Sequence, residues 1–267
     1  SIMKQTILKT LLVAVAAMFV TERAVAWENV GHAVIAYNAE RLLDPEVKAK
    51  CRHYLKATIP FYATWMDQAR SIEPYTVCDK WHSTNIDANN KVVVGKSTTG
   101  AYHIERIRKE MANGAYKNMS DSLVKINLQY LIHMVGDHHC PGHIRWNQTS
   151  HPQHFYKVKR KGKNFSTHRF WDGSPGFGRK GWNCEIYYDH FTPLSKGKVK
   201  KVQQGTGYDW TQDTADASYQ CFEVLPEGTE IAKLSAEDIE TIHSIVDERL
   251  QYAAYRLAYV IEEIFKY

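Results

Sequence analysis

Two histidine–aspartate pairs with the same spacing are the residues of this sequence best suited to do chemistry. His133 is followed four residues later by Asp137, and His168 is followed four residues later by Asp172. Residues four apart on a helix lie about 5–6 Å apart on one face, so each pair can hold one metal ion or two neighbouring ions. When either pair is taken alone, a plain His–Asp hydrogen bond is its more common role, and a metal site is the less common one.

Further residues of ligand type strengthen the case for a metal centre. They are His32, Asp67, His82 and His143. Arg70 stands one helical turn after Asp67 and adds a cation. Imidazole and carboxylate groups, in a sequence without any CxxC pair, favour zinc.

A mostly helical chain must bring these residues together. Ser120 predicts the start of a helix that runs to about Asp137. The capping box Ser235-Ala236-Glu237-Asp238 predicts a helix that keeps its apolar spacing nearly to the C-terminus. At Asp44-Pro45 an apolar stretch ends and an amphipathic helix is expected to begin, with Asp44 as its cap.

The segments between these helices have a different composition. Residues 154–158 and 163–167 flank Lys159-Arg160-Lys161-Gly162, which predicts a small hairpin. Residues 173–209 are rich in Gly, Lys and aromatic residues and are expected to be loop. We therefore predict a mainly α fold: a single helical domain with a small β-hairpin and long loops.

The first 26 residues have the order of a signal peptide. Lys4 and Lys9 precede the apolar run Leu11 to Val20, and Ala24-Val25-Ala26 supplies the small residues before a cleavage site. Ten apolar residues are too few for a membrane-spanning helix, which needs about 20, and no later segment qualifies. We predict cleavage before Trp27, export to the periplasm or the outside, and a catalytic domain over residues 27–267; a buried N-terminal helix is the alternative.

The composition excludes several classes of protein. Of 267 residues, 44% are hydrophobic and 24% are charged, so the chain is neither disordered nor fibrous. The formal net charge of +5 is too small for a protein that binds nucleic acid by charge alone. The five cysteines cannot all pair within one chain. We interpret Cys140 as a small buried thiol, and a stray metal ligand or a disulfide partner are its alternatives.

The ordered motifs of the sequence resemble the type I nucleases, the zinc-dependent single-strand-specific nucleases of fungi and plants that are related to bacterial zinc-dependent phospholipase C. The resemblance spans nearly the whole chain after residue 26. It rests on Trp27-Glu28-Asn29-Val30-Gly31-His32, Trp65-Met66-Asp67-Gln68-Ala69-Arg70, Trp81-His82, His133-Met134-Val135-Gly136-Asp137, Pro141-Gly142-His143, His168-Arg169-Phe170-Trp171-Asp172 and Tyr255-Arg256-Leu257-Ala258.

This resemblance implies three zinc ions in a cleft of a helical fold. Trp27, through its free amine and carbonyl oxygen, and His32 would hold one ion. Asp67, His82 and His133 would hold a second ion, and Asp137 would bridge these two. The third ion would be bound by His143, His168 and Asp172.

The same resemblance implies a phosphodiesterase. Two close zinc ions lower the pKa of a shared water and supply hydroxide near neutral pH, which attacks phosphorus in line. Asp67 and Asp137 thereby become catalytic, and Arg70 would bind the phosphate with its planar guanidinium. Asn85 stands where the family contacts the base.

Three positions depart from the family pattern and bear on the substrate. Ser83 replaces the aromatic residue that stacks on a base, Cys140 replaces Gln, and Gly142 replaces Leu. His138 and His139 are expected either beside the ligands or at the surface. Ser83 weakens base stacking, and the departures together leave the substrate preference open and the ligand set intact.

The function predicted from these residues is an exported endonuclease that cleaves single-stranded DNA or RNA to 5′-phosphorylated products, with 3′-nucleotidase activity, acting as a monomer. One alternative keeps the metals and cleaves phospholipid headgroup esters, as Ser83 would allow. Another is an exported zinc-binding protein without turnover, which Arg70 argues against because a storage site needs no phosphate clamp.

Overall fold

The computed structural model describes residues 27, 29–146 and 156–266, and most of them are helical. The α-helices are α2 (Asn29–Leu42), α3 (Pro45–Leu55), α4 (Trp65–Ala69), α5 (Gly100–Met111), α6 (Asp121–Asp137), α7 (Thr167–Gly173), α8 (Cys184–His190), α9 (Lys196–Gln203), α10 (Gly207–Val224) and α11 (Ala236–Phe265). The predicted cleavage of residues 1–26 lies outside the described residues. The mainly α fold predicted from the sequence is confirmed.

Short 3-10 helices and strands connect the α-helices. The 3-10 helices are η1 (Pro60–Tyr62), η2 (Tyr75–His82), η3 (Ala115–Asn118), η4 (Pro141–His143), η5 (Ser174–Gly176) and η6 (Ile231–Lys233). The strands are β1 (Thr84–Asn85), β2 (Ile144–Arg145), β3 (Lys157–Arg160) and β4 (Lys163–Ser166).

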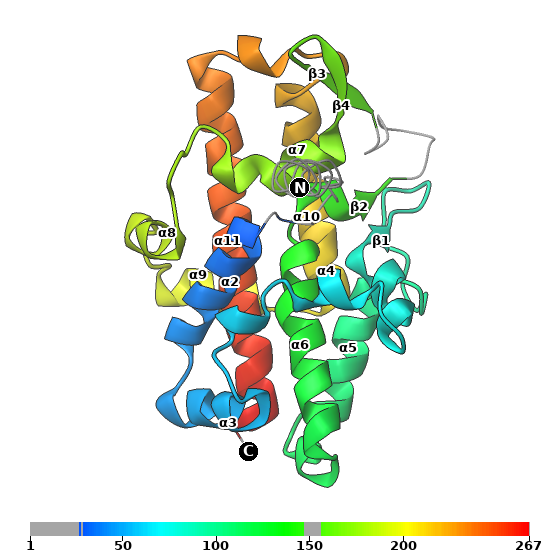
Figure 1. Ribbon diagram of the computed structural model, residues 1–267, viewed down its shortest axis with the longest axis vertical. Coiled ribbons are helices and arrows are strands. Elements are labelled where there is room, and N and C mark those ends of the chain that lie inside the picture. The colour runs from blue at the N-terminus through cyan, green and yellow to red at the C-terminus, as the bar shows by residue number, and fades with distance from the viewer. Residues whose placement is uncertain (1–26, 28, 147–155, 267) are drawn as a thin grey trace, which may run out of the picture.

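The long C-terminal helix α11 forms the axis of the molecule. It packs along α2 and also contacts α3, α5, α6, α9 and α10 (Figure 1). Its Ser235–Asp238 capping box is present as predicted, with Ser235 Oγ accepting from the Asp238 amide at 3.0 Å. One apolar core runs from Trp27 at the start of α2 to Phe265 at the end of α11, so burial of α11 ties the two ends of the described chain together.

The helix α6 carries the first His–Asp pair into the interior. Ser120 caps it as predicted, accepting a hydrogen bond from the Leu123 amide. Every residue from Asn127 to Asp137 is buried. The helix therefore crosses the core and ends inside it, where the macrodipole places its negative end.

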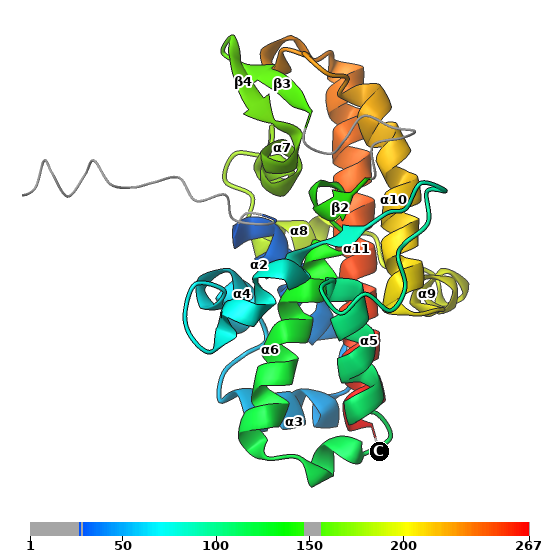
Figure 2. The ribbon, with the colours of Figure 1, turned by 90° about the vertical axis from the view of Figure 1, so that its right-hand side faces the viewer.

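The predicted hairpin forms with a shorter turn than expected. In the antiparallel pair β3–β4, Arg160 lies opposite Lys163, so only Lys161 and Gly162 form the turn. Both have positive φ, 53° and 73°, which is the conformation of a two-residue hairpin turn. Figure 2 shows the hairpin at one end of the molecule, above α7.

The prediction of loop over residues 173–209 is wrong in part. This segment holds α8, α9 and the start of α10. Asn183 and Ser195 accept hydrogen bonds from the first turns of α8 and α9, and Thr206 forms a capping box with Asp209. Local caps thus start helices where the composition resembles loop.

The structure differs from the sequence prediction at the start of α3 and in one short strand pair. Helix α3 begins at Pro45 as predicted, but the Asp44 side chain makes no capping hydrogen bond and lies 3.8 Å from Lys266 Nζ. A short parallel pair, β1–β2, was not predicted; it aligns Thr84 with Ile144 and Asn85 with Arg145. Within the described ranges the helices are each too short or too polar to span a membrane.

Candidate metal centre

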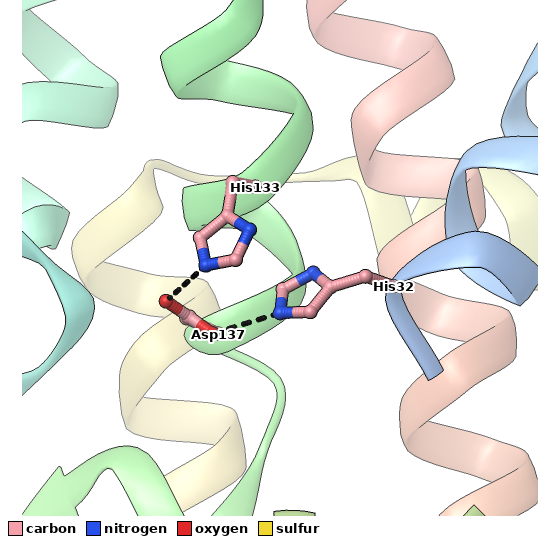
Figure 3. A group of neighbouring side chains, drawn as sticks. All are labelled: His32, His133 and Asp137. Atoms are coloured by element: carbon pink, nitrogen blue, oxygen red, sulfur yellow. Dashed lines mark hydrogen bonds and ion pairs between the residues drawn. The ribbon is translucent and has the colours of Figure 1, made fainter. Parts of the chain in front are cut away.

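Asp137 lies at the centre of a buried cluster of imidazoles. Its carboxylate is fully buried. His32 Nε2 is 3.1 Å from Oδ1, while His82 Nδ1 and His133 Nε2 are 2.8 and 3.2 Å from Oδ2. Figure 3 shows His32, from α2, and His133, from α6, pointing at the Asp137 carboxylate between them. Three segments far apart in sequence therefore converge on one carboxylate.

Asp67 adds a second carboxylate to this side of the cluster. It comes from α4, and its oxygens lie 3.7 Å from His82 Nδ1 and from His133 Nε2. His133 Nδ1 donates to the carbonyl oxygen of Ala63 at 2.8 Å. That hydrogen bond turns Nε2 toward the two carboxylates, and once the ring is neutral Nε2 is the nitrogen without a proton, which is the tautomer a metal ligand requires.

The second His–Asp pair forms the other half of the cluster. His168 and Asp172 share one face of α7, with His168 Nε2 3.2 Å from Asp172 Oδ2. His143, in η4, reaches Asp172 Oδ1 with Nε2 at 3.1 Å and Asp137 Oδ1 with Nδ1 at 3.7 Å. The turn after α6 thus connects the two halves.

Trp27 is packed into this centre at the start of α2. Its backbone nitrogen donates to Asp172 Oδ1 at 3.3 Å, and its indole Nε1 donates to the carbonyl oxygen of Gly136 at 2.7 Å. The structure therefore places Trp27 beside Asp172, a residue that the resemblance assigns to a different ion. The residue and its neighbour His32 both lie within the same cluster.

The electrostatics of the cluster favour a bound cation. Burial disfavours charge on His133, but the carboxylates of Asp137 and Asp67 outweigh it and raise its pKa to about 8. The Asp137 and Asp172 carboxylates overcome burial in the same way and raise the pKa of His143 to about 9. Burial prevails at His168, where it lowers the pKa to about 4. Without a metal, the negative charge of the carboxylates is thus balanced by protons on the His133 and His143 rings.

Several buried polar atoms in the cluster accept or donate no hydrogen bond within the described chain. They are His32 Nδ1, both carboxylate oxygens of Asp67, His82 Nε2 and Asp172 Oδ2. Burying such atoms unsatisfied is costly. Three groups have ligand atoms within 4.8 Å of one another: His32, His133 and Asp137; Asp67, His82 and His133; and Cys140, His143 and Asp172. This donor set of imidazole and carboxylate fits zinc.

Of the two predicted substrate contacts, the structure places Arg70 at the edge of the cluster. Arg70 is 28% exposed, with Nη2 3.9 Å from Asp67 Oδ1 and Nε 3.9 Å from Asp79 Oδ1. Asn85 is half-buried in β1, three residues after His82. The structure therefore places Arg70 against a cluster residue, whereas Asn85 is only near one in sequence.

Sequence reasoning overlooked Arg145. Its Nε donates to the Ser83 hydroxyl, and the β1–β2 register sets it opposite Asn85. Its position two residues after His143 could have indicated that Arg145 lies near the cluster.

His138 and His139 are both buried, which excludes the surface alternative. His138 accepts a hydrogen bond from the Thr84 hydroxyl at 2.6 Å, and His139 accepts one from Arg256 at 2.8 Å. All five cysteines lie in the described ranges and each is a free thiol, as Cys140 was expected to be.

A helical fold that buries a His–Asp cluster of metal-ligand type beside an arginine is compatible with a metal-dependent hydrolase, and comparison with known proteins identifies the class. The S1/P1 nuclease profile matches residues 27–266. The chain belongs to this family, and it is a nuclease, a hydrolase of phosphodiester bonds whose substrate is nucleic acid.

Similarity to a characterised protein agrees with this assignment. The chain is 24% identical to Nuclease S1 of Aspergillus oryzae (strain ATCC 42149 / RIB 40) over an alignment 285 positions long, gaps included, which covers 94% of this chain and 96% of that protein. The family match favours a nuclease over the phospholipase and over the zinc-binding protein without turnover.

Proposed function

We propose that this protein is an exported, zinc-dependent endonuclease that cleaves single-stranded DNA and RNA to 5′-phosphorylated products and also acts as a 3′-nucleotidase. The observation that carries the proposal is Asp137, a fully buried carboxylate contacted by His32, His82 and His133. A buried carboxylate shared by three imidazoles is the arrangement expected of a ligand that bridges two cations.

In this proposal the cluster would hold three ions. Trp27, His32 and Asp137 would hold one ion, and Asp67, His82 and His133 would hold a second ion together with Asp137. His143, His168 and Asp172 would hold the third. Zinc in such a centre supplies Lewis-acid charge and makes water a stronger acid.

The chain's own residues orient the substrate. Arg70 lies partly exposed beside Asp67, so its guanidinium can take two phosphate oxygens while Asp79 balances its charge in the free protein. Its rigid fork binds the substrate phosphate and holds it against the Asp67 and Asp137 side of the cluster as negative charge develops.

Recognition of the base falls to the β1–β2 pair. The amide of Asn85 contacts the base edge, and Arg145, aligned with Asn85, presents a planar cation. Ser83 cannot stack on a base, but its hydroxyl accepts from Arg145 Nε and orients the guanidinium. A guanidinium can stack on a base in place of an aromatic ring.

Export provides the terminal group that the centre needs. Residues 1–26 act as a signal peptide, and residues 27–267 form the catalytic domain of a monomer in the periplasm or outside the cell. Removal of the signal peptide converts the Trp27 amide nitrogen into an amine, which has a free lone pair for a metal. The distance of 3.3 Å from this nitrogen to Asp172 Oδ1 supports its place in the centre.

A substrate panel tests the proposal. Exported protein, with its N-terminal residue sequenced, is assayed on single-stranded DNA, single-stranded RNA, duplex DNA, a nucleoside 3′-monophosphate and phosphatidylcholine. We expect turnover of both single strands and the nucleotide, little turnover of duplex, and loss on chelation that zinc restores. Activity that survives complete removal of metal, or turnover of phosphatidylcholine alone, contradicts it.

A further inference from the structure

Cys140 stands in the turn that connects the two halves of the metal centre. It lies between α6 and η4, three residues after Asp137 and three before His143, and it is fully buried. Its Sγ donates to Asp172 Oδ1 at 3.4 Å, and the same oxygen is 3.1 Å from His143 Nε2. The thiol therefore shares a carboxylate oxygen with a residue of the third proposed ion site.

Three of the distances among these atoms match those expected between ligands of one tetrahedral ion. Typical zinc–sulfur and zinc–nitrogen bonds of about 2.3 and 2.0 Å give ligand-to-ligand distances of about 3.3–3.6 Å. Cys140 Sγ lies 3.4 Å from Asp172 Oδ1. His168 Nε2 lies 3.3 Å from His143 Nε2 and 3.2 Å from Asp172 Oδ2.

A second observation at the same place points to a cation. Asp172 is 2% exposed, and its Oδ2 accepts no hydrogen bond within the described chain. Cys140, His143 and Asp172 each offer one ligand atom within 4.8 Å of the others. A buried thiol beside an imidazole and a buried carboxylate, one oxygen of which accepts no hydrogen bond although His168 Nε2 lies 3.2 Å from it, is a combination typical of metal sites, whereas a thiol that only fills space needs neither group.

We propose that Cys140 binds, as a thiolate, to the ion held by His143, His168 and Asp172. This inference rests on the proposed zinc centre. On binding, the sulfur–hydrogen bond breaks, the proton leaves to solvent, the sulfur lone pair forms the bond to the metal, and no electron is transferred.

A thiolate changes the character of this ion site. Four protein ligands leave fewer positions for water or substrate than three do, and a soft sulfur ligand favours zinc, cadmium or cobalt over magnesium or manganese. The three ions would then be unequal, because the two held by Asp137 have only oxygen and nitrogen ligands.

Cobalt substitution tests the inference without reliance on activity. The full exported protein is stripped of metal with a chelator and reloaded with Co²⁺, and its absorption spectrum is recorded together with cobalt content. Bound Co²⁺ gives visible bands with any ligands, whereas a thiolate ligand adds an intense charge-transfer band in the near ultraviolet. The same spectra are recorded for Cys140→Ala and Cys140→Ser, and for Cys51→Ala and Cys221→Ala. The last two remove buried thiols that, among the described residues, belong to no group of metal-ligand type.

We expect the charge-transfer band in the wild type and in both remote variants, and its loss in both Cys140 variants while the visible bands remain. If the wild type binds cobalt but lacks the near-ultraviolet band, Cys140 is not a ligand, and the proposal of a metal centre is unaffected. This result needs only the wild type, so it holds even if neither Cys140 variant folds. A band that persists in a folded Cys140 variant also overturns it. Failure of the wild type to bind cobalt or zinc at all contradicts the metal centre itself.

Discussion

Arg256 on α11 donates a hydrogen bond from Nη1 to His139 Nε2 at 2.8 Å, deep inside the molecule. His139 is two residues beyond Asp137, and its Nδ1 donates to the Val135 carbonyl at 2.6 Å. The central helix thus holds the turn beside the candidate metal centre through one buried contact. Burial and the neighbouring guanidinium keep the pKa of His139 well below its usual value, so the ring is a neutral acceptor.

Replacing Arg256 tests how far this contact stabilises the fold. Arg256→Ala leaves the His139 nitrogen and the Val202 carbonyl without their donor, and Asp213 loses one of its two cations. We expect the free energy of unfolding to fall by about 2–3 kcal/mol, since Asp213 is partly solvated. Urea unfolding measures it. Arg52→Ala, at a side chain 56% exposed, is the control and should change it by less than about 0.5 kcal/mol.

The same substitution at two helical glycines should have opposite effects. A Cβ at Gly136 would lie 2.7 Å from His32 Nδ1, whereas a Cβ at Gly197 in α9 meets nothing within 4 Å. Gly197→Ala should stabilise the protein by about 0.5–1 kcal/mol through helix propensity. Gly136→Ala should instead displace His32, lower the melting temperature and reduce bound zinc. A stabilised Gly136 variant with full zinc content would contradict the packing described for His32.

Asp137 should be indispensable for metal and for turnover. Asp137→Asn removes the charge that His32, His82 and His133 surround, so zinc content and single-strand cleavage should both fall. The loss of activity should exceed about 100-fold, the upper range for groups that merely orient a metal ligand. Metal analysis and a DNA cleavage assay measure it, with Asp216→Asn on the exposed face of α10 as control. Normal zinc content in the Asp137 variant would refute the bridging role.

Zinc uptake should release protons near neutral pH. The pKa values of about 8 for His133 and about 9 for His143 mean that both rings carry a second proton in the metal-free protein at pH 7. Zinc must displace these protons, so its affinity should fall as the pH falls, with about two protons released from these residues at pH 7. Calorimetry in buffers of different ionisation enthalpy counts them; uptake without proton release would exclude this protonated apo state.

Arg70 should act on substrate and leave the metal in place. Arg70→Ala should lower kcat/KM on single-stranded DNA by about 10²–10³-fold, the range for loss of one charge-stabilising group, at unchanged zinc content. Arg106→Ala is a matched control, because Arg106 is 29% exposed against 28% for Arg70 and pairs with Glu110 on its own helix. Equal kinetics in the two variants would remove Arg70 from the site.

Much of this protein follows from local sequence patterns. Ser120 and the Ser235–Asp238 box predict where α6 and α11 begin, because a cap satisfies backbone groups within three residues of itself. The i, i+4 spacing places His133 beside Asp137 and His168 beside Asp172, because the two members of each pair lie on the same helix. The helices α8 and α9 escaped prediction because their caps lie within a lysine- and glycine-rich segment that resembles loop.

Tertiary structure alone decides which residues meet across the chain. No spacing could indicate that His32 and His82 reach the same carboxylate of Asp137, that Arg256 holds His139, or that Cys140 shares an oxygen of Asp172 with His143. These contacts arise because the packing of α2 and α6 around α11 and the turn at η4 orient the side chains. Sequence determines which groups are available; packing determines which of them are buried together, and burial is what makes a cluster of carboxylates require a cation.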